Sequence, residues 1–557
     1  MVVRATNIPV RSEELTQTSS RKSSTATAPA SKFMPFKSMS SHPHVFVTIS
    51  LKDHHLSSRT SSAEGTNPMW NEQLKLPFNL KSDATKRVLS IDLYDEVVED
   101  LVDNVTEVYQ RISSKWLGSL KIPLAHIFTN QRIEGMFEMT IPTVLLGYTK
   151  PTFAATDQGY QTNNSEGLPH MSKKTHINLF ISLEPNAEIP RMMSNGLECI
   201  EIELVERQIK MWFEQLKLEF PSRVTKWSPL ITLLTGKRAC ITRLLHPLKF
   251  PFDKNDEMTE FKIRRFVSLI PLQNDASPSN SCCSGLNGVW LSNTQILGLM
   301  TSSNKDLGVL LTCYYLELGY PSWLILGSSN TCGECCYVLM RKSSEFFIID
   351  PASGKKYSSK DVYCPLTSCF CLVNQYNVWA NIQREQRIFM MQFDVNRSFD
   401  WRPMFQKVVD IPKETIHDVT FRYERSFHVK DLQQTIQAKI VKKINSWRSH
   451  KKTIWNRYVC ENLKQILEKL EDDVCFENDF DDHAEMLKAL YVNYKITGYT
   501  INNKYTNLSS IVNDIKNTGI HLNLDSKVEF ASSVYIKEYA NNVLSIWIFL
   551  MSLTPKM

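Results

Sequence analysis

The sequence predicts a multidomain α+β protein, in which an antiparallel β-sandwich precedes a central α+β domain and a C-terminal α+β region. Chain length is the first indication, because 557 residues, of which 42% are apolar, can bury about three or four separate cores. The second is a series of short alternating strands in the first third of the chain. The third is a helical pattern near the middle, which is followed at once by three strand patterns.

The central domain is organised around a helix that begins near Asn304. Apolar residues recur at helical spacing from Val309 to Leu318, and Gly319 with the nearby Pro321 ends the helix. Short apolar runs bounded by turn compositions then predict strands at 323–326, 336–340 and 346–349. A helix that leads into such a sheet, with an acidic residue after the third strand, can carry a Cys/His/Asp triad.

This order of elements resembles the transglutaminase-like, papain-related core. In active members, the resemblance implies a Cys at the start of the helix, a His at the start of the second strand and an Asp at the end of the third. The corresponding positions of this chain hold Asn304, Cys335 and Asp350. The sequence contains no His between His246 and His417. We therefore expect a catalytically degenerate domain, a pseudoenzyme with no catalytic residues.

The alternative is a divergent cysteine peptidase or transglutaminase. It would need His176, His246 or His417 to reach the site from outside the core, with Cys313 or Cys336 as a displaced nucleophile. A thiol is activated only by a neighbouring base in suitable geometry, so the sequence favours the inactive domain.

In the first part of the chain, apolar and polar residues alternate as they do in the strands of an antiparallel sandwich, beginning with the strand MVVRATNI at Met1. The segment NPMWNE and the strand IDLYD resemble a C2 domain. A stretch rich in Ser, Thr, Ala and Lys is expected to be a disordered insertion. The predicted boundaries are 1–190 for the C2-like sandwich, 11–41 for the insertion, 191–225 for a linker helix, 226–400 for the transglutaminase-like domain and 401–557 for the C-terminal region.

Calcium-binding C2 domains hold the ion with several carboxylates from two loops. The second loop of this chain keeps Asp95 but has Val97 at the next ligand position, and 42–44 reads His-Pro-His where the first loop would be acidic. We expect no calcium, no metal and no cofactor. A membrane-binding C2 adaptor, with peripheral membrane contact that does not need calcium, stays an alternative. The remaining acids are interpreted as a solvated loop: Glu96, Glu99, Asp100 and Asp103.

The linker helix is predicted from an apolar stripe over 197–220 that includes Leu204. Strands are predicted at 263–272 and 387–395, with a disordered bridge at 273–288. The C-terminal region is expected to begin with helices over 430–473, followed by a helix, a loop, a helix and two strands. The apolar run 543–553 is too short to cross a membrane and is interpreted as a buried strand. Cations after the first helix suit its dipole: Arg448, His450, Lys451 and Lys452.

Thirteen Cys residues occur in the sequence, and the first 198 residues contain none. With no apolar leader at Met1, this pattern indicates a reduced, intracellular protein. Zinc is an alternative for the Cys-rich hairpin, but a single C-x-x-C is weak support, so buried unreactive thiols are favoured. The cysteines concerned are Cys332, Cys335, Cys336, Cys364, Cys369 and Cys371.

Over nearly its whole length, the chain resembles the coiled-coil and C2 domain-containing 2 family of ciliary transition-zone proteins, and within it the B paralogue. The resemblance implies a scaffold that supports cilium assembly and protein localisation at the ciliary base, in the cytoplasm and cytoskeleton. It implies partners in the tectonic-containing transition-zone complex, including small C2-like proteins. The family's upstream coiled coil is missing here, which suggests an isoform or a short member. A net charge of +6 gives no argument for nucleic acid.

Overall fold

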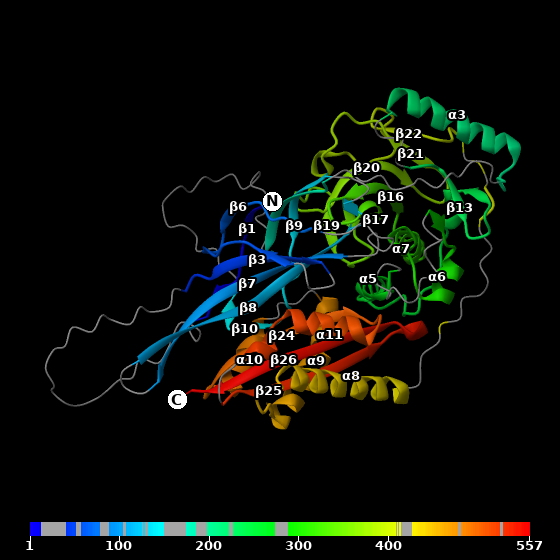
Figure 1. The fold of residues 1–557 in the computed structure, drawn as a ribbon. Helices are drawn as coiled ribbons and strands as arrows, with labels where there is room; N and C mark the ends of the chain where they lie inside the picture. The colour runs from blue at the N-terminus through cyan, green and yellow to red at the C-terminus, as the bar shows by residue number, and fades with distance from the viewer. Residues whose placement is uncertain are drawn as a thin grey trace, which may run out of the picture.

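The structure is a computed structural model that combines helices with largely antiparallel sheets, as the sequence predicts (Figure 1). Three modules meet at a common junction: an N-terminal sandwich, a central α+β domain and a C-terminal sheet with helices. No helix within the described residues is both long and apolar enough to cross a membrane. The structure describes residues 1–12, 41–51, 57–77, 88–103, 107–124, 126–127, 132–149, 174–184, 198–221, 227–272, 288–407, 409, 411–413, 421, 426–476, 481–523 and 527–556.

The N-terminal sandwich consists of two antiparallel sheets that enclose one apolar core, as alternating strands require. The predicted strands are all present in it. One sheet has the order β6 (Met69–Glu72), β1 (Val2–Thr6), β12 (His176–Ser182) and β9 (Arg132–Glu138). The other has the order β4 (Ser57–Arg59), β3 (His44–Leu51), β7 (Val88–Asp103) and β8 (Glu107–Pro123), with β5 (Ala63–Glu64) paired to β3.

Two predicted boundaries in this half of the chain need correction. Arg11, placed in the insertion by its polar context, lies buried in β2 (Val10–Arg11), which pairs with β11 (Tyr148–Thr149). Most of the insertion, 13–40, lies outside the described residues. The linker helix is α3 (Glu203–Glu219), which starts later than expected because 198–200 extend alongside Arg238 instead.

The stripe expected on α3 is also only partly correct. Ile209, Trp212 and Leu216 are buried against the central domain, so α3 packs as part of that domain. Leu204 is 72% exposed and lies on the opposite side of the helix. The helical period was correct, but the choice of which apolar residues face inward depended on contacts far away in sequence.

The central domain contains a long antiparallel sheet with helices packed on one face. The predicted helix is α7 (Asn304–Leu318), and the three predicted strands are β16 (Ser322–Ser329), β17 (Gly333–Lys342) and β18 (Glu345–Ile349). The sheet order is β19 (Lys356–Ser358), β18, β17, β16, β20 (Leu366–Val373), β21 (Val378–Asn381) and β22 (Trp401–Pro403). A small sheet of β14 (Arg238–Cys240), β13 (Leu230–Leu233) and β15 (Val289–Trp290), and helix α6 (Asn293–Leu299), complete it.

Two strands predicted here are wrong. The run at 263–272 forms helix α5 (Thr259–Leu269), because Ile263, Phe266, Val267 and Ile270 are buried at helical spacing. The run at 387–395 begins with a short 3-10 helix, Ile388–Met390. Most of the predicted bridge, 273–287, lies outside the described residues.

The C-terminal module is a five-stranded sheet with helices on both faces (Figure 1). Its central strand β26 (Leu544–Pro555) is buried on both faces, which confirms the interpretation of 543–553. The sheet order is β10 (Leu145–Leu146), β24 (Tyr494–Lys504), β26, β25 (Glu529–Glu538) and β23 (Ile454–Trp455). The helices are α8 (Ser426–Trp447), α9 (Arg457–Phe476), α10 (Asp481–Leu490) and α11 (Leu508–Asn517).

Two features of this module differ from expectation. The loop predicted after α10 is strand β24, which pairs along its whole length with β26. Arg448 is not free at the end of α8, since it donates 2.8 Å to the carbonyl of His521, after α11, and lies over the ring of Phe530. The strand β10 belongs in sequence to the sandwich, so the first and third modules share a sheet.

Candidate functional site

The start of helix α7 is the first candidate site, because the nucleophile of an active relative would stand there. Ser303 and Asp306 form a capping box that fixes the first turn. Asn304 Oδ1 accepts a hydrogen bond of 2.8 Å from the backbone N–H of Cys336 on β17. The helix also packs tightly on the sheet, since a Cβ at Gly308 would lie 2.9 Å from Cys336 Cβ. The amide of Asn304 therefore joins helix to strand.

The expected His position is shifted by one residue. Cys336 faces α7 and packs in the same core as Val338, whereas Cys335 points to the other face with Tyr337. Successive residues of a strand point to opposite faces, so the residue nearest the helix is Cys336 and not Cys335.

Asp350 lies apart from Asn304, on the side of the sheet where its charge contributes to raising the pKa of Cys335, after burial and Cys332. Its Oδ1 accepts 3.0 Å from the N–H of Ala352, and its Oδ2 accepts 2.7 Å from the hydroxyl of Ser353. Asp350 directly follows Ile349, the last residue of β18, and the side chain of Ile349 faces the helix, so Asp350 belongs to the opposite face with Cys335. The structure therefore brings Asn304 to Cys336 but does not bring Asn304, Cys335 and Asp350 together.

The displaced nucleophiles have the wrong protonation state for attack. Burial raises the pKa of Cys336 to about 12 and that of Cys313 to about 11, although a reactive thiol needs a lowered pKa. The Cys313 thiol donates to the carbonyl of Leu244. Burial, followed by Lys413, lowers the pKa of His246.

The other two candidate bases lie elsewhere. His176 is on β12 of the sandwich, with its ring 4.7 Å from that of Tyr363. His417 lies outside the described residues. His176 is therefore not brought to α7.

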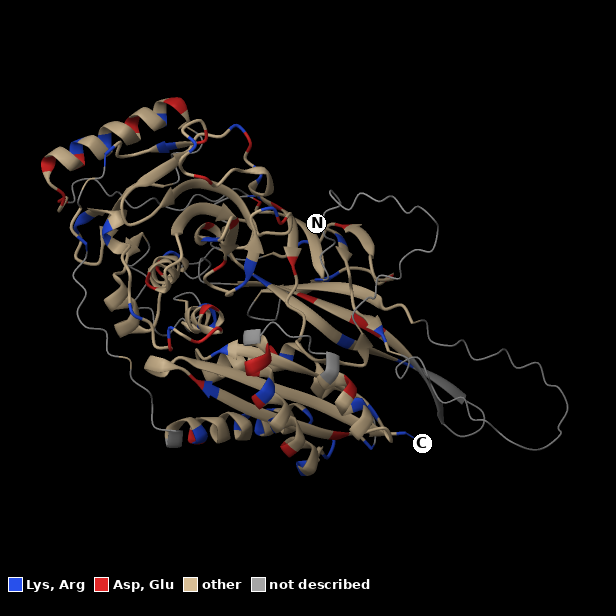
Figure 2. Cartoon of the chain, turned by 180° about the vertical axis from the view of Figure 1, so that it is seen from behind, with Lys and Arg blue, Asp and Glu red and all other residues tan. Residues whose placement is uncertain are grey.

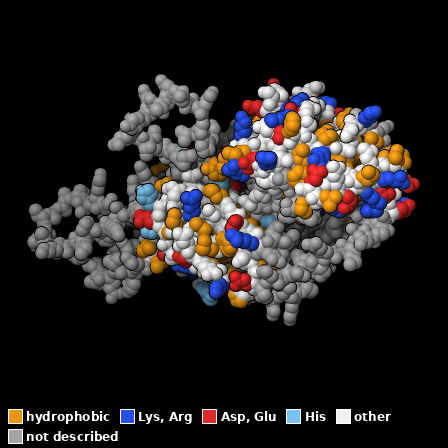
Figure 3. Space-filling view, turned by 90° about the horizontal axis from the view of Figure 1, so that it is seen from above, with side chains coloured by type: hydrophobic (Ala, Val, Ile, Leu, Met, Phe, Trp, Pro, Cys, Tyr) orange, Lys and Arg blue, Asp and Glu red, His pale blue; other side chains and the backbone are white. Residues whose placement is uncertain are grey.

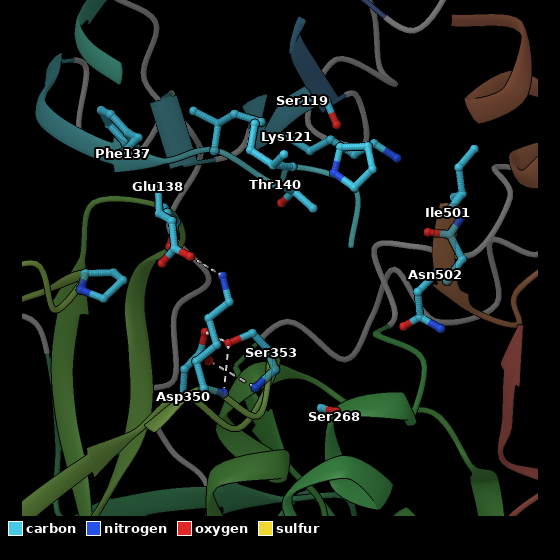
Figure 4. Close-up of a pocket in the computed structure, with 18 of the residues that line it drawn as sticks. Ser119, Lys121, Phe137, Glu138, Thr140, Ser268, Asp350, Ser353, Ile501 and Asn502 are labelled. Atoms are coloured by element: carbon cyan, nitrogen blue, oxygen red, sulfur yellow. Dashed lines mark hydrogen bonds and ion pairs between the residues drawn. The ribbon is translucent and has the colours of Figure 1, made fainter. Parts of the chain in front are cut away.

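Asp350 lines a cavity of about 580 Å³ at the junction of the three modules (Figure 4). The sandwich contributes Lys121 and Glu138, the central domain Asp350, and the C-terminal module Asn502. Charges of both signs line it, and two of its carboxylates, Glu138 and Asp514, pair with the lysines Lys355 and Lys121. This cavity is therefore a polar joint between modules, and sequence reasoning did not identify it, because its walls come from residues hundreds of positions apart.

Two ion pairs cross the junction from the sandwich. Lys355 Nζ lies 2.8 Å from Glu138 Oε1, and Lys121 Nζ lies 2.8 Å from Asp514 Oδ1. Burial would raise the pKa of Glu138, but Lys355 and Lys174 outweigh it, so the net pKa is lowered. The carboxylate is therefore kept charged between the first and second modules.

A buried polar network joins the second and third modules. Arg265 of α5 donates 3.0 and 2.9 Å to the two carboxylate oxygens of Glu471 on α9, and 2.8 Å to Asn502 Oδ1. Glu471 also accepts from the hydroxyl of Tyr539 at 2.6 Å and from the indole of Trp547. Only 1% of the Glu471 side chain is exposed, so the network is sealed from solvent.

Comparison with known proteins agrees with this architecture. A family model described as C2 domain matches 25–139, the CEP76 peptidase-like domain matches 288–404, and the Centrosomal protein of 76 kDa C-terminal domain matches 425–553. The Drosophila melanogaster protein named Coiled-coil and C2 domain-containing protein 2A is 36% identical over 576 residues, covering 100% of this chain and 42% of the relative. The chain belongs to the coiled-coil and C2 domain-containing 2 family.

A second member of this family, the human Protein CC2D2B, is 28% identical over 541 residues, covering 92% of this chain and 36% of the relative. The chain thus spans less than half the length of both curated relatives. Because the Drosophila relative carries the A name and the human relative the B name, the assignment to the B paralogue stays a prediction.

Asp95, the acid that the second C2 loop keeps, is bound by other residues of the same chain. Both oxygens of Asp95 are engaged by Arg11, at 2.6 and 2.8 Å, and further bonds come from the N–H of His44 at 2.9 Å and the hydroxyl of Tyr148 at 2.7 Å. Arg11 and Asp95 are both buried. The guanidinium of Arg11 thus takes the position beside the carboxylate that a calcium ion would need. Sequence analysis missed this contact because it placed Arg11 in the insertion.

The cysteine-rich hairpin does not assemble a metal site among the residues that the structure describes. Cys336 and Cys371 pack on the helix side of the sheet, whereas Cys335 and Cys369 pack on the other side. Burial is the first cause that raises the pKa of each of these thiols. Strand alternation places Cys336 and Cys371 on the face opposite Cys335 and Cys369, and the buried thiols pack as small apolar side chains.

Proposed function

We propose that this chain is a non-enzymatic scaffold of the ciliary transition zone, where its folded surfaces hold partner proteins. The observation that carries the proposal is the hydrogen bond from the Cys336 N–H to Asn304 Oδ1. Where an active relative would present a thiol, this chain presents an amide that is already used to tie helix to strand. Cys335 and Asp350 point away from that position, so the peptidase-like domain acts as a pseudoenzyme.

The way the modules are joined also supports a scaffold. Contacts between them include a shared sheet through β10, the Arg265–Glu471 network and the Lys355–Glu138 pair. Such joints give the chain a fixed arrangement of surfaces, which a protein that holds partners in place needs. The proposed location at the ciliary base rests on family membership, and the C-terminal family model, which is named for a centrosomal protein, supports it.

The proposed partners are proteins of the tectonic-containing transition-zone complex, including small C2-like proteins. This part of the proposal rests on family membership alone, since the whole relatives are more than twice as long as the matched segment. We also propose that any membrane contact is peripheral and independent of calcium, because Asp95 is bound by Arg11.

A thiol-directed activity probe tests the absence of catalysis. Labelling of the full chain should decrease in Cys332→Ala, because Cys332 is an exposed thiol that reacts nonspecifically, and should be unchanged in Cys313→Ala, Cys336→Ala and His246→Ala. Labelling that is abolished both by Cys313→Ala or Cys336→Ala and by His246→Ala would reject the pseudoenzyme.

Imaging of a tagged chain in ciliated cells tests the scaffold itself. The expected result is a focus between basal body and axoneme that Asp350→Asn leaves intact. Removing the sandwich is unsuitable, because β10 would be lost from the C-terminal sheet. Met69→Glu, at a side chain 62% exposed on β6, is a gentler probe of that surface. An even distribution through the cytosol would reject the proposal.

A further inference from the structure

Helix α3 presents an apolar row to solvent. Leu204, Met211 and Leu218 are 72%, 68% and 85% exposed, and they are seven residues apart. At 1.5 Å per residue the row extends over about 21 Å of helix. The opposite side of α3 is buried in the central domain, and the helix lies on the outer side of the molecule, away from the other two modules (Figure 1).

This spacing indicates what kind of partner fits. Residues that recur every seven positions stay on one side of a helix, with a drift of about 20° per repeat, and such a row packs against another helix. Figure 3 shows hydrophobic side chains between charged ones on this side of the molecule. Large apolar side chains in a row, rather than scattered singly, indicate an interaction surface.

The charges beside the row select a second copy of the same helix. Residues of both signs alternate along α3 (Figure 2). On one flank of the row lie Arg207 and Glu214, and on the other lie Gln208 and Gln215, all exposed. If two copies of α3 pack antiparallel about a twofold axis at Met211, Arg207 of one copy meets Glu214 of the other, and glutamines meet glutamines. A parallel pair would place Arg207 against glutamine instead.

We propose that this chain forms a homodimer through an antiparallel α3–α3 contact, with Leu204 packed against Leu218 of the second copy and Met211 against its own equivalent. In the isolated chain, Arg207 pairs with Glu203 at 2.7 Å and Lys217 with Glu214 at 2.7 Å. These pairs are exposed and contribute little to stability, so replacing them with pairs across the contact costs little free energy. A contact of one helix per copy is small, so the dimer is weak and concentration-dependent.

Sedimentation velocity of the full chain across a concentration series tests the dimer. The expected result is a shift from monomer to dimer that Met211→Glu and Leu218→Glu each abolish. Leu490→Glu is the matched control, because Leu490 is 55% exposed on another helix, α10. A chain that stays monomeric at the highest concentration, or a dimer that persists in Met211→Glu, overturns the proposal.

Charge reversal and cross-linking test the orientation. Arg207→Glu should weaken the dimer, and the double variant Arg207→Glu/Glu214→Arg should restore it, since the charges then meet again in reversed order. Under mild oxidation, Leu204→Cys chains mixed with Leu218→Cys chains should form a disulfide, whereas Leu204→Cys alone should not. A disulfide between two Leu204→Cys chains would show a parallel contact and overturn the antiparallel one.

Discussion

Arg11 and Asp95 form a buried bidentate ion pair across the edge of the sandwich, although 84 residues separate them in sequence. The side chains are 2% and 0% exposed. Asp95 is the acid that a calcium loop would have used, and Arg11 comes from a segment whose composition suggests an insertion. The pair therefore changes a candidate ligand into a structural contact.

The first prediction is that the full chain binds no calcium at micromolar concentrations, because Arg11 already engages both oxygens of Asp95 and Tyr148 donates to Oδ2 as well. Isothermal calorimetry should show no heat of binding. Heat that disappears in Asp95→Asn would contradict this expectation. Arg11→Met should also show no heat of binding, since it frees the carboxylate of Asp95 without adding a further calcium ligand.

The second prediction is that Arg11→Met destabilises the sandwich by about 3–5 kcal/mol, since it leaves the carboxylate of Asp95 buried and unpaired. Hydrogen exchange of the amides in β3 and β7 measures this locally in the full chain. The control is Arg59→Met, which removes a partly exposed pair with Glu96 and should cost less than about 1 kcal/mol. Equal effects of the two variants would contradict the argument.

The third prediction concerns the joint between the second and third modules. Burial would raise the pKa of Glu471, but Arg265 and the hydrogen bonds outweigh burial, so the net pKa is lowered. A lowered carboxyl pKa contributes stability above its ordinary value of about 4.3, and this contribution is lost as the pH falls through the lowered value. The joint should therefore resist proteolysis at neutral pH and loosen in acid.

Arg265→Ala should loosen the same joint already at neutral pH, by about 3 kcal/mol or more, because it leaves Glu471 charged and buried. Limited proteolysis between the modules measures the effect. Lys254→Ala, which removes an exposed pair with Glu317, is the control and should behave like the unaltered chain.

The fourth prediction concerns Asp92, at the contact between the first and third modules. Its contribution to stability should depend on pH with the sign opposite to that of Glu471. Burial raises the pKa of Asp92 to about 6, with a smaller contribution from Asp514, while the indole of Trp116 and Lys121 lower it. A raised carboxyl pKa favours the protonated form in the folded chain, so stability increases as the pH falls through 6. Asp92 should contribute about 1–2 kcal/mol more stability near pH 5 than near pH 7.5, measured by thermal unfolding as the difference between the unaltered chain and Asp92→Asn. The difference is needed because His126, His176, His246 and His521, whose pKa values are lowered by burial, oppose it equally in both chains.

Asp92→Asn should remove this dependence and stabilise the chain at the higher pH, whereas the exposed Glu334→Gln should leave it unchanged. An equal pH dependence of the unaltered chain and Asp92→Asn would contradict the prediction.

The fifth prediction separates structure from catalysis at Asn304. Asn304→Ala leaves the N–H of Cys336 without its acceptor and should cost about 1–3 kcal/mol of stability. It should leave reactivity toward thiol probes unchanged, because the pKa of Cys336 is raised by burial. Denaturant unfolding and probe labelling measure the two effects independently. A loss of labelling without a loss of stability would contradict the structural role.

The sequence alone determined the features that depend on neighbouring residues. Helix α7 and its end at Gly319 follow from apolar spacing and from the left-handed conformation that Gly319 adopts. The strand β26 follows from an apolar run of limited length, and the sandwich from period-two alternation with the NPMWNE turn. These signals are local, so they survive without knowledge of the fold.

Only the tertiary structure decided which distant groups meet. A short strand, β10, leaves the sandwich to extend the C-terminal sheet, and Arg265 finds Glu471 across 206 residues. The choice between Cys335 and Cys336 as the residue facing α7 depends on strand register, and a shift of one residue reverses the faces. Composition and periodicity carry no information on such pairings, because contacts between modules are set by how whole surfaces fit and not by the residues next in the chain.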